Sequence, residues 1–168
     1  MKDLGLINLN QLSPSEAATL KQRTAARAVV FDTNNHVALL HAGKNGYYKL
    51  PGGGIEPGED PKQALVRECM EELGCSIDVR GEVGKIIEYR RDLHQTSYCY
   101  LATLVGMQNA PHYTEEELAE EFEYLWKPLS EAIDLVSQAT PTNLEGTFIK
   151  ERDARFLRET QTLLHLLA

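Results

Sequence analysis

The pattern of apolar residues around residue 30 predicts two strands joined by a turn. Residues 26–32 are mainly β-branched or apolar, and residues 36–41 have a similar composition. Between them, Thr33-Asn34-Asn35 supplies residues that favour turns, so the two runs are expected to form a hairpin. Further strands are predicted over residues 47–50, 77–79, 84–89, 96–105 and 125–129, with a polar turn near 92–94.

The most clearly bounded helix is predicted over residues 61–73. Asp60 is a suitable N-cap, Pro61 fits the first turn, and Gln63 completes a capping box. Gly74 follows at the position where helices commonly end in a left-handed residue. Cap residues and apolar spacing predict further helices over about 13–22, 130–137 and 148–166, and the Glu-rich segment 111–123 is expected to be a loop with a helical turn.

The length of the chain indicates one domain. A chain of 168 residues is close to the size that folds around a single core. We therefore expect a single domain over residues 1–168 with one catalytic centre. A helical extension over about 1–22 is expected at its start, and the closing helix over about 148–166 is expected to pack on the sheet.

Charge and cysteine content exclude several classes of protein. The net charge of −8 leaves no diffuse basic surface to bind polymeric DNA or RNA. No run approaches the roughly 18 apolar residues of a membrane span, and the N-terminus lacks the apolar core of an export signal. Cys69, Cys75 and Cys99 form no C-x-x-C pair, which is typical of reduced thiols. We expect a cytoplasmic protein that binds neither membranes nor nucleic-acid polymers.

The predicted helix over 61–73 has an acidic face. If Glu68 defines the zero direction, Glu72 lies near about 40° and Glu71 near about 300°, while the apolar residues lie on the opposite side. Ionised glutamates this close repel one another, and a divalent cation would reverse the sign of the interaction. Arg67 is placed to pair with Glu71 and to help orient the carboxylates. Before the helix, Gly52-Gly53-Gly54 offers unhindered backbone to a metal or a phosphate.

These residues belong to a pattern of about 23 residues whose spacing resembles the signature of the Nudix hydrolase family, which includes MutT-like enzymes. The fixed identities of that signature are all present: Gly53, Glu59, Arg67-Glu68, Glu71-Glu72 and Gly74. Cys69 and Cys75 stand where the family usually has aliphatic residues. Since buried cysteine behaves as a small hydrophobe, we expect this departure to change packing and not chemistry.

The resemblance implies an α/β (α+β) fold, an α/β/α sandwich with a mixed sheet between helices. It also implies that Glu68, Glu71 and Glu72 hold one or more Mg²⁺ ions, with Mn²⁺ as the alternative metal. The carbonyl of Gly52 is often an additional ligand in the family. In the implied reaction, water attacks a phosphorus atom of a diphosphate while the metal neutralises charge and activates that water.

The position of the general base differs within the family, so several glutamates are candidates here. Some members use a glutamate of the signature, such as Glu68 or Glu71, and others use one in a loop outside it. Glu120 stands six residues before Trp126, as in MutT-like members, and is preferred to Glu121 and Glu117. For each residue of this acidic segment, a solvated loop is the alternative interpretation.

Substrate contacts are predicted from residues near the signature. Arg23 and Arg27 flank the entry to the first predicted strand, where they can reach phosphates or a base, although a surface charge is the alternative. Tyr48, with Tyr47 beside it, is a candidate for stacking on a base, although aromatic residues of strands commonly belong to the core. The backbone of Gly53-Gly54 is expected to approach a phosphate.

The favoured function is hydrolysis of a nucleoside-diphosphate-linked substrate, for example an unmodified or oxidised nucleoside triphosphate that gives monophosphate and pyrophosphate. ADP-ribose, nucleotide sugars and dinucleoside polyphosphates are alternatives, because nothing in the sequence reads the base. A Nudix module that senses a nucleotide without cleaving it is a second class, against which the intact glutamates argue. Isomerisation of an isoprenoid diphosphate is a third, for which Cys69 and Cys75 lie in the wrong context. For the hydrolase, the partner is a nucleotide-like small molecule, and a homodimer is compatible with the resemblance.

Overall fold

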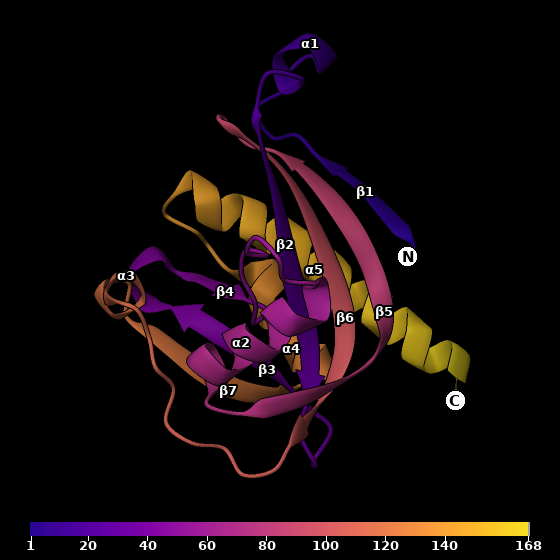
Figure 1. Ribbon diagram of the computed structural model, residues 1–168, viewed down its shortest axis with the longest axis vertical. Coiled ribbons are helices and arrows are strands. Elements are labelled where there is room, and N and C mark those ends of the chain that lie inside the picture. The colour runs from indigo at the N-terminus through magenta and orange to yellow at the C-terminus, as the bar shows by residue number, and fades with distance from the viewer. Residues whose placement is uncertain (168) are drawn as a thin grey trace.

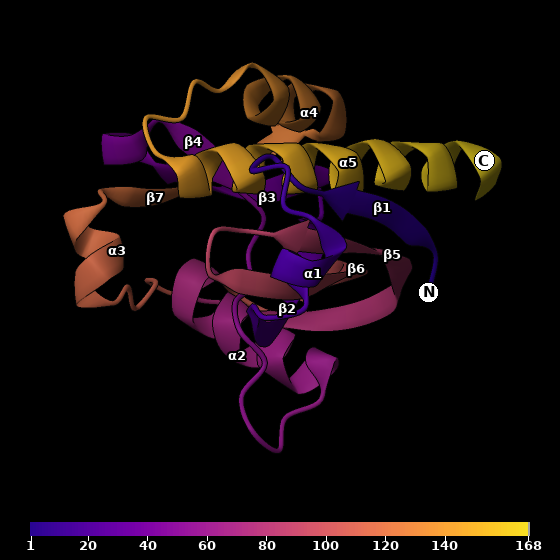
Figure 2. The same cartoon turned by 90° about the horizontal axis from the view of Figure 1, so that it is seen from above.

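The computed structural model describes residues 1–167 and has helices on both faces of one seven-stranded mixed sheet (Figures 1 and 2). The strands are β1 (Asp3–Ile7), β2 (Lys21–Phe31), β3 (His36–Ala42), β4 (Tyr47–Lys49), β5 (Ser76–Tyr89), β6 (Leu93–Val105) and β7 (Phe122–Pro128). The helices are α1 (Pro14–Ala17), α2 (Pro61–Leu73), α3 (Glu115–Ala119), α4 (Leu129–Gln138) and α5 (Leu144–Leu167), with a short 3-10 turn η1 (Gly43–Asn45). The α/β/α sandwich is confirmed.

The sheet divides beside β2. Its strand order is β1-β5-β6-β2-β3-β4, and β7 pairs with β3. β2 pairs in parallel with β6 from Lys21 to Phe31, but it meets β3 only where Phe31 lies opposite Val37. The predicted hairpin is therefore joined only at its tip. Beyond the tip, the two strands leave a wedge at the edge of β2.

The segment after β4 fills this wedge. The backbone N–H of Ala28 donates to the carbonyl of Pro51 at 3.0 Å, and that of Ala26 donates to the carbonyl of Gly53 at 3.0 Å. These bonds satisfy the edge of β2 that β3 leaves unpaired. The glycine-rich segment is therefore placed by a strand that precedes it by more than twenty residues in the sequence.

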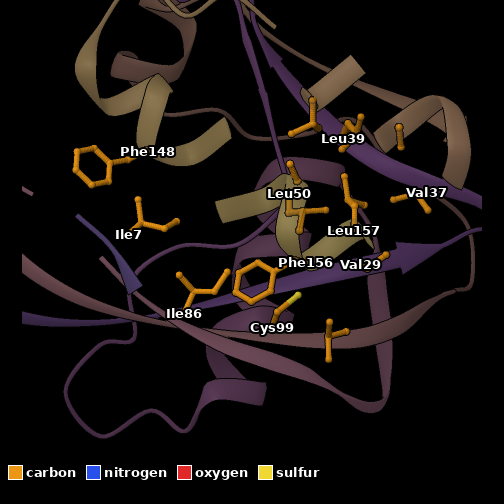
Figure 3. Close-up of a cluster of buried hydrophobic side chains, with 14 residues drawn as sticks. Ile7, Val29, Val37, Leu39, Leu50, Ile86, Cys99, Phe148, Phe156 and Leu157 are labelled. Carbon is orange, nitrogen blue, oxygen red and sulfur yellow. The ribbon is translucent and has the colours of Figure 1, made fainter. Parts of the chain in front are cut away.

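Two apolar cores hold the helices to opposite faces of the sheet. Because side chains alternate along a strand, Ala28 and Val30 of β2 face α2, whereas Val29 faces α5. Phe148, Phe156 and Leu157 of α5 form one core, the core under α5, with residues of β1, β3 and β5, as Figure 3 shows. The core under α2 contains Leu65, Cys69 and Leu73 from the helix. Of the apolar stripe predicted for that helix, these three residues are buried, whereas Val66 and Met70 remain exposed.

The bounds of α2 are as predicted because its end signals are local. Asp60 accepts from the backbone N–H groups of Lys62 and Gln63, and the Gln63 side chain completes the capping box. Gly74 ends the helix in the left-handed conformation with φ of 65°. Each of these interactions spans only a few residues, so the sequence alone identifies them.

The N-terminal part differs from the helical extension expected over 1–22. Residues 3–7 form strand β1, which runs parallel to β5, and the helix that Ser13 caps ends at Ala17 instead of Gln22. The residues after it, from Lys21, extend the strand predicted to begin at residue 26, because they pair with β6. The predicted strands over 77–79 and 84–89 are likewise one bulged strand, β5. Pairing partners distant in the sequence caused each of these differences.

None of the helices over residues 1–167 combines the length and the apolar content that a membrane crossing requires.

Replacing Gly74 with alanine is expected to lower the free energy of unfolding by more than about 1 kcal/mol. A Cβ at this left-handed position would lie 2.1 Å from the carbonyl oxygen of Asn109, so the backbone would have to shift. Chemical denaturation of the two proteins measures the loss. Gly81→Ala is the matched control, because a Cβ there has no heavy atom within 4 Å. Equal losses in the two variants would contradict the role of Gly74.

Candidate active site

A cavity of about 280 Å³ opens beside the glycine-rich segment that fills the wedge. Glu68 and Glu72 reach it from α2, and Arg23 and Arg27 reach it from β2. A larger cavity, of about 490 Å³, lies at the C-terminal end of β2 and has mainly apolar walls. None of the predicted site residues lines the larger cavity, so the smaller one is the candidate active site.

Glu68 lies directly against the backbone of the glycine-rich segment. A Cβ added at Gly53 would lie 2.2 Å from Oε1 of Glu68, so only glycine leaves room for this carboxylate. The Glu68 side chain keeps 15% of its surface exposed, toward the cavity that it lines. Because Gly53 has no side chain, the Glu68 carboxylate fits against its backbone, and this space is called the Gly53 cradle below.

Glu72 is almost fully buried, and basic and backbone groups surround its carboxylate. The N–H of Gly52 donates to Oε2 at 2.7 Å, and Nζ of Lys49 forms an ion pair with Oε1 at 2.7 Å. Burial raises the pKa of Glu72, while Lys49 and the Gly52 N–H oppose that rise. A carboxylate from α2 is thus tied to both sides of the turn that connects β4 to the glycines.

Arg67 connects the loop to the helix. It donates to Glu59 through Nε at 2.8 Å and through Nη2 at 3.0 Å, and Nη1 donates to Glu68 at 2.7 Å. Nη2 also donates to the carbonyl of Gly54 at 3.1 Å. The hydrogen bonds from Arg67 hold the pKa of Glu59 at about 2. Arg67 does not line the cavity, so its geometry is that of a residue that positions Glu68 and Gly54.

Glu71 lies apart from the other two glutamates of α2. Its side chain is 47% exposed and does not line the cavity, and its Oε2 lies 3.7 Å from Nη1 of Arg67. Partial burial and the nearby charge of Glu68 raise the pKa of Glu71. The structure thus brings Glu68 and Glu72 to the cavity and leaves Glu71 at its margin.

The two predicted arginines both line the cavity, in different surroundings. Arg27 is only 6% exposed, and its Nη1 donates to the carbonyl of Ala26 at 3.0 Å. Its Nε–H has no hydrogen-bond partner within the described residues. Burial lowers the pKa of Arg27 to about 10, so the guanidinium stays charged at neutral pH. Arg23 is more exposed, and its Nη1 donates to Oε1 of Gln95 at 3.1 Å.

Tyr48 does not reach the cavity, whereas its neighbour Tyr47 lines it. Alternation along β4 directs Tyr47 and Lys49 to one side and Tyr48 to the other. On that other side Tyr48 stacks on His41, with ring centroids 4.5 Å apart, and packs against the core under α5. Its geometry therefore corresponds to the alternative interpretation, a residue of the core.

Helix α3 supplies an acidic wall. Glu116, Glu117 and Glu120 all line the cavity, and the hydroxyl of Tyr47 donates to Oε2 of Glu120 at 3.3 Å. Of the three candidate bases in this segment, Glu117 and Glu120 thus line the cavity and Glu121 does not. Glu120 thus has a position from which it can reach a molecule in the cavity.

The donor set of this cavity suits a hard divalent cation. Its candidate ligands are carboxylate and backbone carbonyl oxygens, and the cradle at Gly53 leaves Glu68 accessible. Over residues 1–167, no three His, Cys, Asp or Glu side chains are grouped as a ready ligand set. Instead Lys49 and Arg67 compensate the carboxylates, so a cation would compete with them for Glu72 and Glu68.

Lys49 and Glu145 were not among the residues predicted for the site. Glu145 comes from the start of α5, and Lys49 forms the ion pair with Glu72. The period of a strand predicts that Lys49 faces the same side as Tyr47, but only the folded chain shows that this side is the cavity. No signal in the sequence connects Glu145 to the glycine-rich segment.

Two relatives show how far the sequence similarity extends. The diphosphoinositol polyphosphate phosphohydrolase 3-beta of Bos taurus is 30% identical over 99 residues, which are 56% of this chain and 58% of that protein. The 8-oxo-dGTP diphosphatase of Proteus vulgaris is 31% identical over 87 residues, which are 49% of this chain and 78% of that protein. The chain thus spans less than two thirds of the length of the diphosphoinositol relatives that it matches.

Solved structures share the fold at lower identity. The solution structure of the E. coli ORF135 protein has a TM-score of 0.62 at 19% identity, over 87% of this chain and 93% of that one. The crystal structure of the C. elegans Ap4A hydrolase has a TM-score of 0.58 at 19% identity, over 86% and 99%. At this identity the similarity establishes the fold alone.

The family model described as NUDIX domain matches residues 21–146. This range begins with β2 and contains the glycine-rich segment, α2 and α3, which together form most of the cavity wall. The resemblance drawn from the signature is confirmed, and this chain belongs to the NUDIX domain family.

Proposed function

We propose that this chain is a magnesium-dependent hydrolase that cleaves a diphosphate linkage in a nucleoside-diphosphate-linked substrate. The observation that carries the proposal is that carboxylates of α2, Glu68 and Glu72, and guanidinium groups of β2, Arg23 and Arg27, line one cavity. Carboxylate oxygens suit Mg²⁺, and guanidinium groups suit phosphate oxygens. The names of the 8-oxo-dGTP diphosphatase and the Ap4A hydrolase are consistent with this class of substrate.

The proposed metal ligands are the carboxylates of Glu68, Glu71 and Glu72 and the carbonyl of Gly52, with Mn²⁺ as the alternative to Mg²⁺. When bound, the metal neutralises phosphate charge and lowers the pKa of a coordinated water. The Gly53 cradle and the ion pair of Lys49 with Glu72 support the assignment of Glu68 and Glu72, because both involve a carboxylate that a second cation can engage.

In the proposed reaction, the residues of the chain bind the diphosphate and accept a proton. Arg27 binds one phosphate oxygen and Arg23 binds another, because both guanidinium groups line the cavity. A water oxygen bonds to phosphorus, the bridging P–O bond breaks, and the leaving phosphate takes the bonding electron pair. Glu120 accepts the proton of the attacking water, and its place on the cavity wall supports that role.

The charges of the cavity disfavour a densely phosphorylated substrate. Three basic side chains line it, those of Arg23, Arg27 and Lys49, whereas the glutamates number six: Glu68, Glu72, Glu116, Glu117, Glu120 and Glu145. A densely phosphorylated inositol would meet this acidic wall at close range, and like charges repel. We therefore prefer a nucleoside triphosphate, unmodified or oxidised, with ADP-ribose, a nucleotide sugar or a dinucleoside polyphosphate as the alternatives.

The proposal is tested by incubating the protein with one panel of compounds, with and without Mg²⁺, and identifying the products by mass. The panel contains nucleoside triphosphates, oxidised guanine nucleotides, ADP-ribose, nucleotide sugars, dinucleoside polyphosphates and a diphosphoinositol polyphosphate. Metal-dependent cleavage of a nucleoside-diphosphate-linked class is expected. No cleavage of any compound, with a nucleotide still bound, would replace the hydrolase with the nucleotide-sensing module.

Glu68→Gln and Glu72→Gln are each expected to reduce turnover of the cleaved substrate by orders of magnitude, because each removes a carboxylate charge that the metal needs. Steady-state kinetics measures the loss, and circular dichroism verifies the fold. Glu115→Gln, on the first turn of α3 and outside the cavity wall, is the control and should keep its activity. Near-normal turnover in both α2 variants would refute the site assignment.

Glu120→Gln is expected to lower kcat by about 100-fold or more while changing KM little, because it removes the proposed base but no proposed metal ligand. The neighbouring Glu121, which does not line the cavity, provides the control Glu121→Gln. A kcat within threefold of the unchanged protein in Glu120→Gln would exclude Glu120 as the base.

A further inference from the structure

Helix α5 carries two adjacent charged residues that are both fully buried. Arg152 and Asp153 each have 0% of their surface exposed. Nε of Arg152 donates to Oδ1 of Asp153 at 2.7 Å, and Nη2 donates to Oδ2 at 3.1 Å. The pair lies beyond residues 21–146, the range that the family model matches. Neither residue lines the cavity.

Within the described residues, Asp153 accepts one further hydrogen bond, which comes from the segment that forms the site. The backbone N–H of Leu50 donates to Oδ2 of Asp153 at 2.8 Å. Leu50 immediately precedes Pro51 and the three glycines, and its side chain is buried in the core under α5, as Figure 3 shows. The first residue of the segment is thus held through its side chain and through its N–H.

The rest of the segment has its anchors on the other side. β2 binds the carbonyls of Pro51 and Gly53, and Glu72 of α2 accepts from the N–H of Gly52. Asp153 therefore supplies the α5 side of a set of bonds that fixes the segment between β2 and α2. If this anchor were lost, the Gly52 N–H and the cradle at Gly53 would depend on β2 and α2 alone.

A second set of buried groups orients Arg152. Nη1 of Arg152 lies 3.5 Å from Oε2 of Glu88, which also accepts from Gln95 at 2.7 Å and from Ser97 at 3.1 Å. Although burial raises the pKa of Glu88, the charges of Arg152 and Arg90 hold it at about 2, so Glu88 stays ionised. Arg152 therefore lies between two buried carboxylates, Asp153 and Glu88, and Glu88 is also paired with Arg90 at 2.8 Å.

Buried ion pairs are costly to form, and apolar residues of similar volume often stabilise a core equally well or better. The pair on α5 adds what an apolar pair cannot supply, an acceptor for the Leu50 N–H at a defined place. We propose that Asp153 is a positioning residue of the active site, which holds Leu50 so that Gly52 and Gly53 meet Glu72 and Glu68, and that Arg152 orients it. This inference rests on the proposed function of the same site.

The test compares Asp153→Ala, which removes the acceptor, with Asp153→Asn, which keeps an acceptor oxygen and loses the charge. Asp153→Ala is expected to lower kcat at least tenfold per folded molecule and to raise the half-saturating Mg²⁺ concentration. Asp153→Asn is expected to melt at a lower temperature but to keep kcat within threefold. Glu151→Gln, on the same helix and only partly buried, is the matched control and should match the unchanged protein.

A structural role alone predicts a different result. Both variants would then melt earlier, while kcat and the half-saturating Mg²⁺ concentration per folded molecule stayed within twofold of normal. That outcome would overturn the proposal. A tenfold loss of kcat in folded Asp153→Asn would also overturn it, because the acceptor oxygen would then not be what the site requires.

Measurements by NMR keep the test decisive where activity or folding is lost. In the unchanged protein, the Leu50 N–H should exchange with solvent as slowly as the amides of β3, and exchange as fast as that of the exposed Gly58 would overturn the proposal. In Asp153→Asn the amide shifts of Gly52 to Gly54, and their response to added Mg²⁺, should stay near normal. If the unchanged protein cleaved no compound, the proposed function would fail, whereas these shifts and this titration would still test the placement of the loop.

Discussion

The active site depends on the backbone bonds between β2 and the segment that follows β4. β2 gives all of one edge to β6 but meets β3 only where Phe31 lies opposite Val37, so its other edge needs a partner. The carbonyls of Pro51 and Gly53 provide that partner. Buried N–H groups need hydrogen-bond partners. β2 can therefore diverge from β3 only because the glycine-rich segment takes the place of β3 beside it. The cavity opens beside it because the three glycines of the segment have no side chains to fill the space.

Charge compensation is the second constraint on this site. Carboxylates that lie close together and partly out of water are unfavourable without cations, and here Lys49 pairs with Glu72 and Arg67 with Glu68. Arg67 has a second function in the geometry, because it also binds Glu59 and the Gly54 carbonyl. The ion pairs that offset the repulsion between the carboxylates of α2 therefore also set the distance between α2 and the loop.

Features that depend on neighbours in the sequence were predictable. The limits of α2 follow from Asp60, Gln63 and Gly74, whose caps involve residues a few positions away. Features that depend on distant partners were not predictable in this way. The start of β2 at Lys21 follows from pairing with Leu93, and strand β1 exists because β5 accepts it. For the same reason Tyr48 was predicted to contact the substrate, whereas the structure places Tyr47 at the cavity.

By itself, the sequence determined the family and the carboxylates that one helix face presents, since the spacing of the signature and the 3.6-residue period of a helix are local properties. It also indicated Arg27 and Glu120 as candidates, but not what surrounds them. Only the tertiary structure decided that Arg27 is buried with an unpartnered Nε–H, that Lys49 faces Glu72, and that Asp153 holds Leu50. Each of these contacts joins elements whose approach depends on how the two cores pack on the sheet, and no local pattern encodes that packing.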